Sequence, residues 1–236
     1  MRLAKEIENP FVEAAVLFFR GCVRSARGEW AGAIRDLAEC RRIAQPIGDL
    51  FRVFIASSFE ARAELMAGNL AAARSLLEEA LALLARLGTR FLAGRADAWF
   101  AECLLQMGEA EAAAPYARDA IRISEELDDP VSAAFGYRAL SQALFHANPS
   151  DWRQAEDAML TALQLQQEAG VRPEIARSYT IYAGMLAQVG QRERATELLA
   201  KATEMVGELG MVGVGSGPSA GTPQPAASLI DALRPL

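Results

Sequence analysis

Histidine is almost absent from this chain of 236 residues, since His146 is the only one. A Ser-His-Asp arrangement would have to be built around that residue, and a metal site made of several histidines cannot be built at all. The three cysteines, Cys22, Cys40 and Cys103, are far apart and form no C-x-x-C pair, which argues against a zinc or redox site. We expect reduced, at least half-buried thiols, no metal, no cofactor and no enzymatic activity.

Basic residues are neither abundant nor grouped. The chain has 24 Lys and Arg against 30 Asp and Glu, a formal net charge of −6. Because a nucleic-acid-binding surface needs clustered positive charge, we do not expect direct nucleic-acid binding. The apolar stretch 11–19 contains Glu13 and is too short to cross a bilayer, and the charged N-terminus is not a signal peptide. The sequence predicts a cytoplasmic protein that does not contact a membrane.

The sequence does contain a repeat, which consists mainly of alanine and leucine. These residues make up much of its 52% apolar content, and they favour helix over sheet. Five turn markers are spaced forty residues apart, with one step of forty-two, and they are Gly28, Gly68, Gly108, Ser150 and Gly190. Small residues stand at three fixed distances from the markers. Seven before are Gly21, Ala61, Ala101, Ala143 and Ala183; five after are Ala33, Ala73, Ala113, Ala155 and Ala195; twelve after are Cys40, Ala80, Ala120, Ala162 and Ala202.

Each interval predicts one helical hairpin, with about seventeen residues in each helix and the marker in the turn between them. Second helices are expected to end where glycine follows the last turn or proline comes just beyond it, at Gly48, Gly88, Gly170, Gly210 and the D-D-P of 128–130. Small side chains let antiparallel helices approach closely, and stacking buries apolar stripes that a single hairpin leaves exposed. The predicted units are 11–48, 51–88, 91–129, 131–170 and 173–210.

The pattern resembles the tetratricopeptide (TPR) repeat over residues 11–210. The resemblance rests on the small residue before the turn, the A-x-x-x-L-x-x-A pattern after it, and the aromatic residue two places past the turn at Trp30 and Trp152. Other units have Leu70, Ala110 and Arg192 there. The period of forty exceeds the usual thirty-four, and most units lack the closing proline. The resemblance implies an all-α, right-handed α–α superhelix of five hairpins with a concave surface. Long-period units of this kind resemble C-terminal arrays of bacterial regulators that pair an ATPase with a nucleotide cyclase or a DNA-binding domain.

The two ends of the chain depart from the repeat. Residues 2–8 align with the end of a second helix whose partner is missing, which indicates either a fragment of a longer protein or a short native capping helix. We expect the exposed face of the first complete helix to be apolar and to permit self-association. Residues 211–228 are rich in Gly, Pro and Ser and predict a flexible linker. The apolar tail 229–236 is either disordered or folds back onto the array.

The resemblance implies a binding groove lined by the first helices. Positions ten, six and three residues before the markers, together with Arg95, give the partner-binding candidates. They are Phe18, Cys22, Ser58, Arg62, Leu65, Arg95, Glu102, Leu105, Leu140, Leu144 and Thr180. His146 is expected to be structural or at the solvent edge.

Three hypotheses for function follow. The first is a non-catalytic protein–protein interaction scaffold that binds a peptide or a partner helix in the groove, as a regulatory region of a larger bacterial signalling or transcription protein. The alternative is a small-molecule sensor, in which the inner surface encloses an effector. Its candidate residues are Arg62, Arg95, Trp99, Glu102 and Tyr137. An enzyme would need a convergent cluster of ionisable groups, which the sequence does not supply.

Overall fold

The computed structural model describes residues 9–210, and every regular element in that range is a helix. The ten helices are α2 (Pro10–Ala26), α3 (Trp30–Ala44), α4 (Leu50–Ala67), α5 (Leu70–Leu87), α6 (Ala93–Gln106), α7 (Ala110–Glu126), α8 (Pro130–Ala147), α9 (Arg153–Glu168), α10 (Arg172–Gln188) and α11 (Arg192–Leu209). The prediction of an all-α fold is therefore confirmed. The segments predicted as a partial helix at 2–8, a linker at 211–228 and a tail at 229–236 lie outside the described residues.

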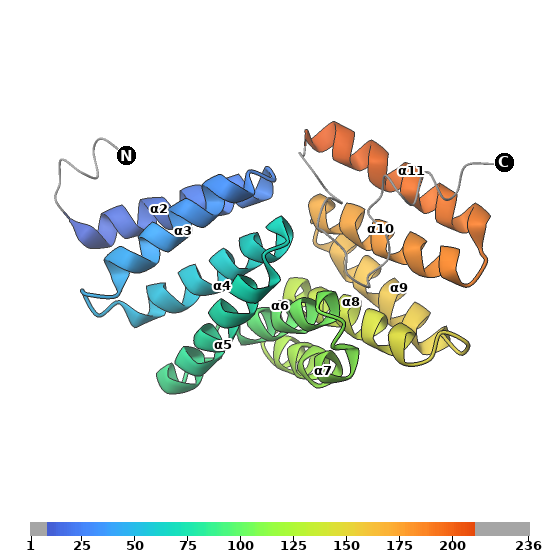
Figure 1. The fold of residues 1–236 in the computed structure, drawn as a ribbon, viewed down its shortest axis with the longest axis horizontal. Helices are drawn as coiled ribbons and strands as arrows, with labels where there is room; N and C mark the ends of the chain where they lie inside the picture. Colours follow the sequence, from blue (N-terminus) through green and yellow to red (C-terminus); the bar gives the residue numbers. More distant parts are fainter. Residues whose placement is uncertain (1–8, 211–236) are drawn as a thin grey trace. The chain divides into compact units, whose positions relative to one another are not determined.

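The described residues form two compact units, which divide between Phe91 and Leu92. Within each unit consecutive helices form antiparallel hairpins, as Figure 1 shows. The first unit holds α2–α3 and α4–α5, and its two hairpins meet where α3 packs on α4. The second unit holds α6–α7, α8–α9 and α10–α11, joined by packing of α7 on α8 and of α9 on α10. There, the first helices α6 and α8 also lie side by side.

The repeated small residues are the places where helices touch. All fifteen residues at the three register positions are buried. A side chain at Gly21 would meet Leu37 of α3, because an added Cβ would lie 2.6 Å from Leu37 Cγ. The register therefore reflects close helix approach within each hairpin.

Every turn between the described helices contains a left-handed residue except the turn between α8 and α9, where the marker Ser150 does not adopt this conformation. Gly68 has a φ of 85°, and behind it Asn69 N donates to Glu64 O at 2.9 Å, satisfying a carbonyl at the helix end. In the third hairpin Asp128 adopts the left-handed conformation, with a φ of 53°. Asp and Asn tolerate this conformation better than other side chains. The helix that follows begins with a cap, since Asp129 Oδ1 accepts from Ser132 N at 3.0 Å.

Helix α6 is shorter than expected. It has 14 residues instead of about seventeen, because its first turn is replaced by a bend. In this bend Phe91 N donates to Thr89 Oγ1 at 3.2 Å, and Leu92 has a φ of 59°. A hydroxyl that bonds to the backbone two residues on competes with helical hydrogen bonding. The sequence prediction missed this because leucine does not favour a left-handed backbone.

A matched pair of glycines tests the close approach of α6 and α7. A Cβ at Gly94 would lie 2.8 Å from Ala120 O and would also clash with Ser124 Oγ, whereas a Cβ at Gly207 in α11 meets nothing within 4 Å. We expect Gly94→Ala to reduce the free energy of unfolding by about 1–3 kcal/mol through overpacking. Gly207→Ala should raise it by up to about 1 kcal/mol through helix propensity. Urea denaturation measures both, and equal effects would contradict this account of the packing.

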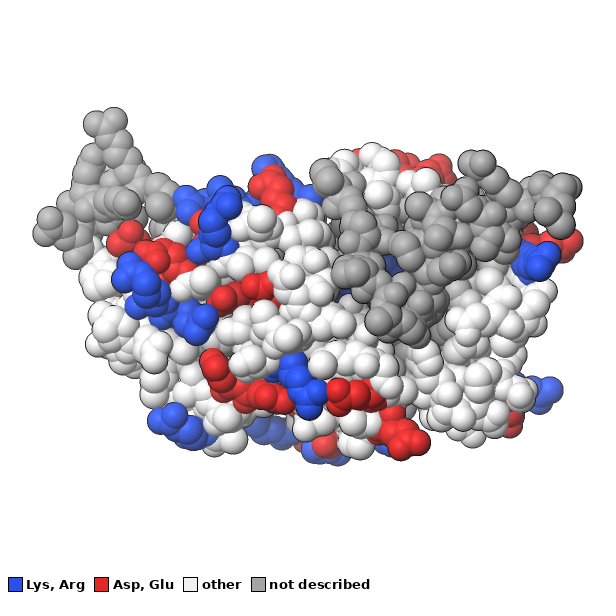
Figure 2. All heavy atoms as spheres, in the orientation of Figure 1, with Lys and Arg blue, Asp and Glu red and all other residues white. Residues whose placement is uncertain are grey.

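Within residues 9–210, no helix has the combination of length and apolar character needed to span a bilayer. The same range contains no group of three or more His, Cys, Asp and Glu side chains placed to hold a metal ion. On the face drawn in Figure 2, acidic and basic side chains lie interspersed among uncharged ones.

Candidate functional site

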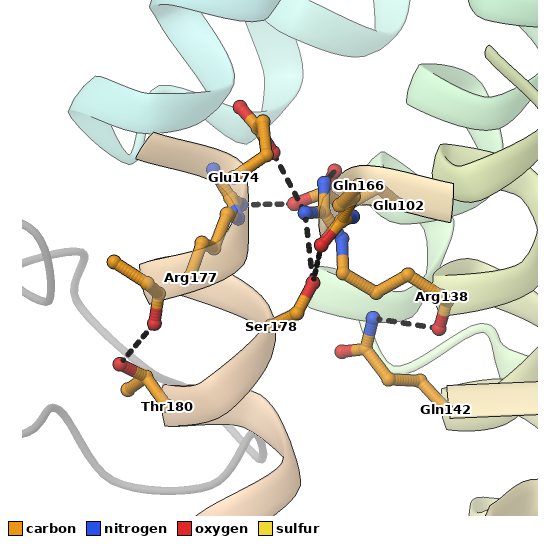
Figure 3. Close-up of polar contacts among 9 residues, drawn as sticks. Glu102, Arg138, Gln142, Gln166, Glu174, Arg177, Ser178 and Thr180 are labelled. Atoms are coloured by element: carbon orange, nitrogen blue, oxygen red, sulfur yellow. Dashed lines mark hydrogen bonds and ion pairs between the residues drawn. The ribbon is translucent and has the colours of Figure 1, made fainter. Parts of the chain in front are cut away.

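A buried polar network joins three first helices of the second unit. Glu102 of α6 forms ion pairs with Arg138 of α8, at 3.4 Å between Nη2 and Oε2, and with Arg177 of α10. Arg138 Nη1 also lies 2.7 Å from Oε2 of Glu174 in α10. Figure 3 shows these side chains converging from the three helices. We call Glu102, Arg138, Glu174 and Arg177 the first-helix network.

Neutral side chains extend the network toward α9. Ser178 Oγ lies 3.4 Å from Arg138 Nη1 and donates to Gln166 Oε1 at 2.8 Å. Gln166 is fully buried, and within residues 9–210 its Nε2 has no hydrogen-bond partner. Gln142 Nε2 donates to the carbonyl of Arg138 at 3.4 Å. The extended network therefore links polar groups of α6, α8, α9 and α10.

The network is balanced in charge and graded in exposure. It contains two carboxylates and two guanidinium groups. The Arg138 side chain is only 1% exposed, whereas those of Arg177 and Glu174 are 12% and 23% exposed. A buried charge is tolerated only when it is paired and hydrogen-bonded. The network therefore fixes the helices from within, and Arg177 and Glu174 carry its charges to the surface.

Arg95 lies beside the network on α6. Its Nε donates to Ser132 Oγ at 3.0 Å, and its Nη2 lies 3.7 Å from Asp129 Oδ2. Burial lowers the pKa of Arg95, an effect that the charge of Asp129 opposes. The guanidinium groups of Arg95 and Arg138 lie 5.8 and 5.3 Å from the centroid of the Phe135 ring. At these distances both guanidinium groups can form a cation–π interaction with the Phe135 ring.

The candidates from the sequence divide into two groups by burial. Six are buried: Phe18, Ser58, Arg62, Leu65, Glu102 and Leu105. Five are half-buried: Cys22, Arg95, Leu140, Leu144 and Thr180. Leu140 and Thr180 share one register position, ten residues before a marker, on α8 and α10.

Other residues singled out in the sequence have definite places. Trp99 is buried, with its ring centroid 6.3 Å from that of Phe135. The Tyr137 hydroxyl is turned toward α7, where it donates to Glu125 Oε1 at 2.8 Å. His146 is exposed in the last turn of α8.

The thiols have the expected surroundings. Cys22 is half-buried, Cys40 and Cys103 are buried, and none of the three forms a disulfide. Burial raises the pKa of Cys22 and of Cys40 to about 11. Neither thiol therefore forms a thiolate nucleophile readily at neutral pH.

Sequence reasoning found Glu102 but missed the other three members of the first-helix network. Arg138, Glu174 and Arg177 fall outside the positions expected to line a groove. One signal was present for Arg138, because it occupies a position that is small or apolar in the other units. The equivalent residues are Val16, Ala56, Ala96 and Ser178. A long charged side chain at a packed position needs a partner, and this is a reason to look for one.

The first unit uses separate, smaller ion pairs. Asp36 of α3 is buried and accepts from two arginines of α2: Arg20, whose Nε lies 2.6 Å from Oδ2, and Arg24, whose Nη1 lies 2.6 Å from the same oxygen. Glu60 of α4 is also buried and pairs with Arg41 of α3, at 3.1 Å between Nε and Oε2. Each pair joins neighbouring helices only.

No protein-family model and no curated protein matches the chain. Solved structures do share its fold. A Rap protein in complex with competence and sporulation factor aligns with a TM-score of 0.71 and 14% identity, covering 88% of this chain and 58% of that one. BtubC from P. vanneervenii aligns with a TM-score of 0.61 and 18% identity, covering 93% and 90%. A signal-transduction ATPase with numerous domains (STAND) from Pyrococcus horikoshii, which has a tetratricopeptide repeat sensor, gives 0.60 and 20%, covering 88% and 31%. The fold is a TPR-like helical repeat.

The TPR-like array thus spans 58% of the Rap protein and 31% of the STAND protein. At 14–20% identity these alignments establish the fold alone. Function must come from the side chains of this chain.

Proposed function

We propose that this TPR-like array is a non-catalytic scaffold that binds a peptide or a partner helix on the surface of its first helices. The first-helix network is the observation that carries the proposal. It fixes α6, α8 and α10 of the second unit through buried charges and leaves Arg177 and Glu174 at the surface. Rigid helices that carry a few charges at fixed positions can recognise matching polar groups on a partner, because little conformational entropy of the array is lost on binding.

Two half-buried side chains supply the other part of the proposed surface. Leu140 of α8 and Thr180 of α10 lie at the same register position of successive hairpins. A partner's apolar side chains would pack there, while Arg177 and Glu174 pair with its polar groups. An amphipathic helix or extended peptide offers both kinds of contact.

The setting that we propose is a cytoplasmic regulatory region of a larger bacterial signalling or transcription protein. Two likenesses support it. The Rap structure that shares this fold is a complex with competence and sporulation factor, and the STAND protein uses its repeats as a sensor. The partner of this array is to be identified by a binding experiment.

Peptide selection on the full chain tests the proposal. A displayed library of random peptides is selected for binding, and the dissociation constants of the selected peptides are measured against variants. Leu140→Glu and Thr180→Arg should each weaken binding about tenfold or more, because a charge replaces a contact that becomes desolvated on binding. The matched control is Leu160→Glu, on the exposed side of the second helix α9.

Selected peptides that lose affinity only with the α8 and α10 variants would support this surface. Peptides that bind all variants alike, or that respond to Leu160→Glu instead, would place binding elsewhere. A library that yields no binder would contradict the proposal.

A further inference from the structure

Helix α2 is apolar on two opposite faces. One face, with Ala14, Leu17 and Gly21, is buried against α3. The other carries Val12, Val16, Phe19, Val23 and Ala26, which are half-buried or exposed. Phe19 is 66% exposed and Val23 is 54% exposed. A helix that is hydrophobic all round is normally buried.

The outward face has the spacing of a helix–helix seam. Its five residues are separated by four, three, four and three positions, so they follow one side of the helix as in a heptad repeat. We call Val12, Val16, Phe19, Val23 and Ala26 the α2 seam. An apolar stripe with this spacing fits the matching stripe of another helix.

Helix α11 shows what a solvated outer helix of this array looks like. Its exposed positions are Arg192, Glu193, Arg194, Thr196, Glu197, Ala200, Lys201, Thr203, Glu204, Gly207, Glu208 and none of them is a large apolar residue. Repeat arrays need such polar outer faces at their ends. The α2 seam has the opposite character, which indicates that something covers it.

Charges along one flank of the seam specify the covering helix. Glu13 and Arg20 of α2 and the C-cap residue Arg27 are seven residues apart and follow the same side of the helix. Arg20 is already neutralised by Asp36. This leaves a negative charge near the start of the flank and a positive charge at its end.

We propose that the α2 seam pairs with the α2 seam of a second copy of this chain, antiparallel and across a two-fold axis near Phe19. Such an axis places each flank against the same flank of the other copy. Glu13 of one copy then faces Arg27 of the other, twice. Val16 of each copy lies opposite Val23 of its mate, and the two Phe19 rings meet at the centre. A parallel pairing would set the charged flank against the uncharged one and would lose both ion pairs.

Sedimentation velocity of the full chain over a range of concentrations is the first test. We expect a monomer–dimer equilibrium whose dissociation constant rises about tenfold or more with Phe19→Glu, since an aromatic side chain at the centre of a small interface carries much of its binding energy. Leu160→Glu is the control, because that leucine is 47% exposed on α9 and lies outside the seam. A strict monomer, or a dimer that Phe19→Glu leaves intact, overturns the proposal.

Charge reversal tests the antiparallel direction. Glu13→Arg alone puts two like-charged pairs into the interface and should weaken the dimer, and Arg27→Glu alone should do the same. The double variant Glu13→Arg with Arg27→Glu restores both attractions and should recover the affinity. A double variant no better than either single one excludes this pairing.

A photo-crosslinker identifies the occupant of the seam. With Phe19→p-benzoylphenylalanine in a mixture of ¹⁴N- and ¹⁵N-labelled full chains, mixed-isotope crosslinks between two peptides from residues 10–27 are the expected product. Crosslinks within one chain, including those to residues 211–236, would show that the seam is covered by the chain itself and would overturn the proposal.

Discussion

Replacing Glu102 by leucine should reduce the free energy of unfolding by about 3–5 kcal/mol, because the change removes one partner of a buried ion pair and leaves the other charged. Arg138, whose side chain is 1% exposed, would then keep Glu174 as its carboxylate within the network, and Arg177 would lose its ion pair with Glu102. Glu102→Gln keeps the hydrogen-bond acceptor and should cost less. Urea denaturation followed by far-ultraviolet circular dichroism measures each variant.

Two controls separate this effect from a general loss of charge. Glu78 pairs with Arg74 on the surface of α5, where both side chains are more than a third exposed, and Glu78→Leu should cost at most about 1 kcal/mol. The triple change Glu102→Leu, Arg138→Met, Arg177→Met removes Glu102 together with both arginines that pair with it and should recover much of the lost stability. Equal losses for Glu78→Leu and Glu102→Leu, or no recovery in the triple variant, would show that the network contributes little.

Replacing Asp97 should have the second large effect, an increase in the free energy of unfolding. Asp97, half-buried on α6, has its pKa raised to about 7 by burial, with a further rise from the charge of Asp119 and an opposing effect of Arg122. In the unfolded chain its pKa is about 3.8. Below the lower value the group is protonated in both states and does not affect stability. As the pH rises from there to about 7, only the unfolded state loses the proton, so the folded state becomes progressively less stable, and the loss is complete above that.

Asp97→Asn removes this ionisation and should therefore stabilise the protein increasingly between about pH 4 and 7, by up to about 2–4 kcal/mol at pH 8. Unfolding free energies of both proteins at pH 4.5, 6, 7 and 8 measure the trend. Asp119→Asn should lower the pKa of Asp97 and reduce the trend in an otherwise unchanged chain. A difference between Asp97→Asn and the parent that is the same at all four pH values would contradict the assigned cause.

The repeat could be predicted from sequence because its physical basis is local to each hairpin. Helices can approach closely only where side chains are small, so Ala33 and its equivalents recur at one distance from the turn and are buried in all five units. Left-handed turns favour glycine, which marks the hairpin ends. The shortened α6 escaped prediction because Leu92 adopts a conformation that its residue type disfavours.

The first-helix network could not be predicted in the same way. Its four members stand six, twelve, sixteen and thirteen residues before their markers, so they share no register position. Their meeting depends on how far each hairpin turns relative to the next, and that rotation is a sum of many packing contacts. The repeat shows which residues hold the same position in different hairpins, but it does not show which residues of different hairpins lie close together. Only Arg138 indicated a nearby charged partner, because it is a charged residue at a position that is small or apolar in the other units.

The span of the Glu102–Arg177 ion pair, 75 residues along the chain, has a consequence for folding. In the first unit the buried carboxylates pair with arginines 12 to 19 residues away, so each of these ion pairs can form as soon as two consecutive helices have packed, in the manner of a one-dimensional array. In the second unit Glu102 completes its ion pairs only when α10 packs on the other helices. We expect α6, α8 and α10 to form one cooperative foldon whose amides exchange with solvent at a common rate, and whose assembly is slowed by its long loop closure.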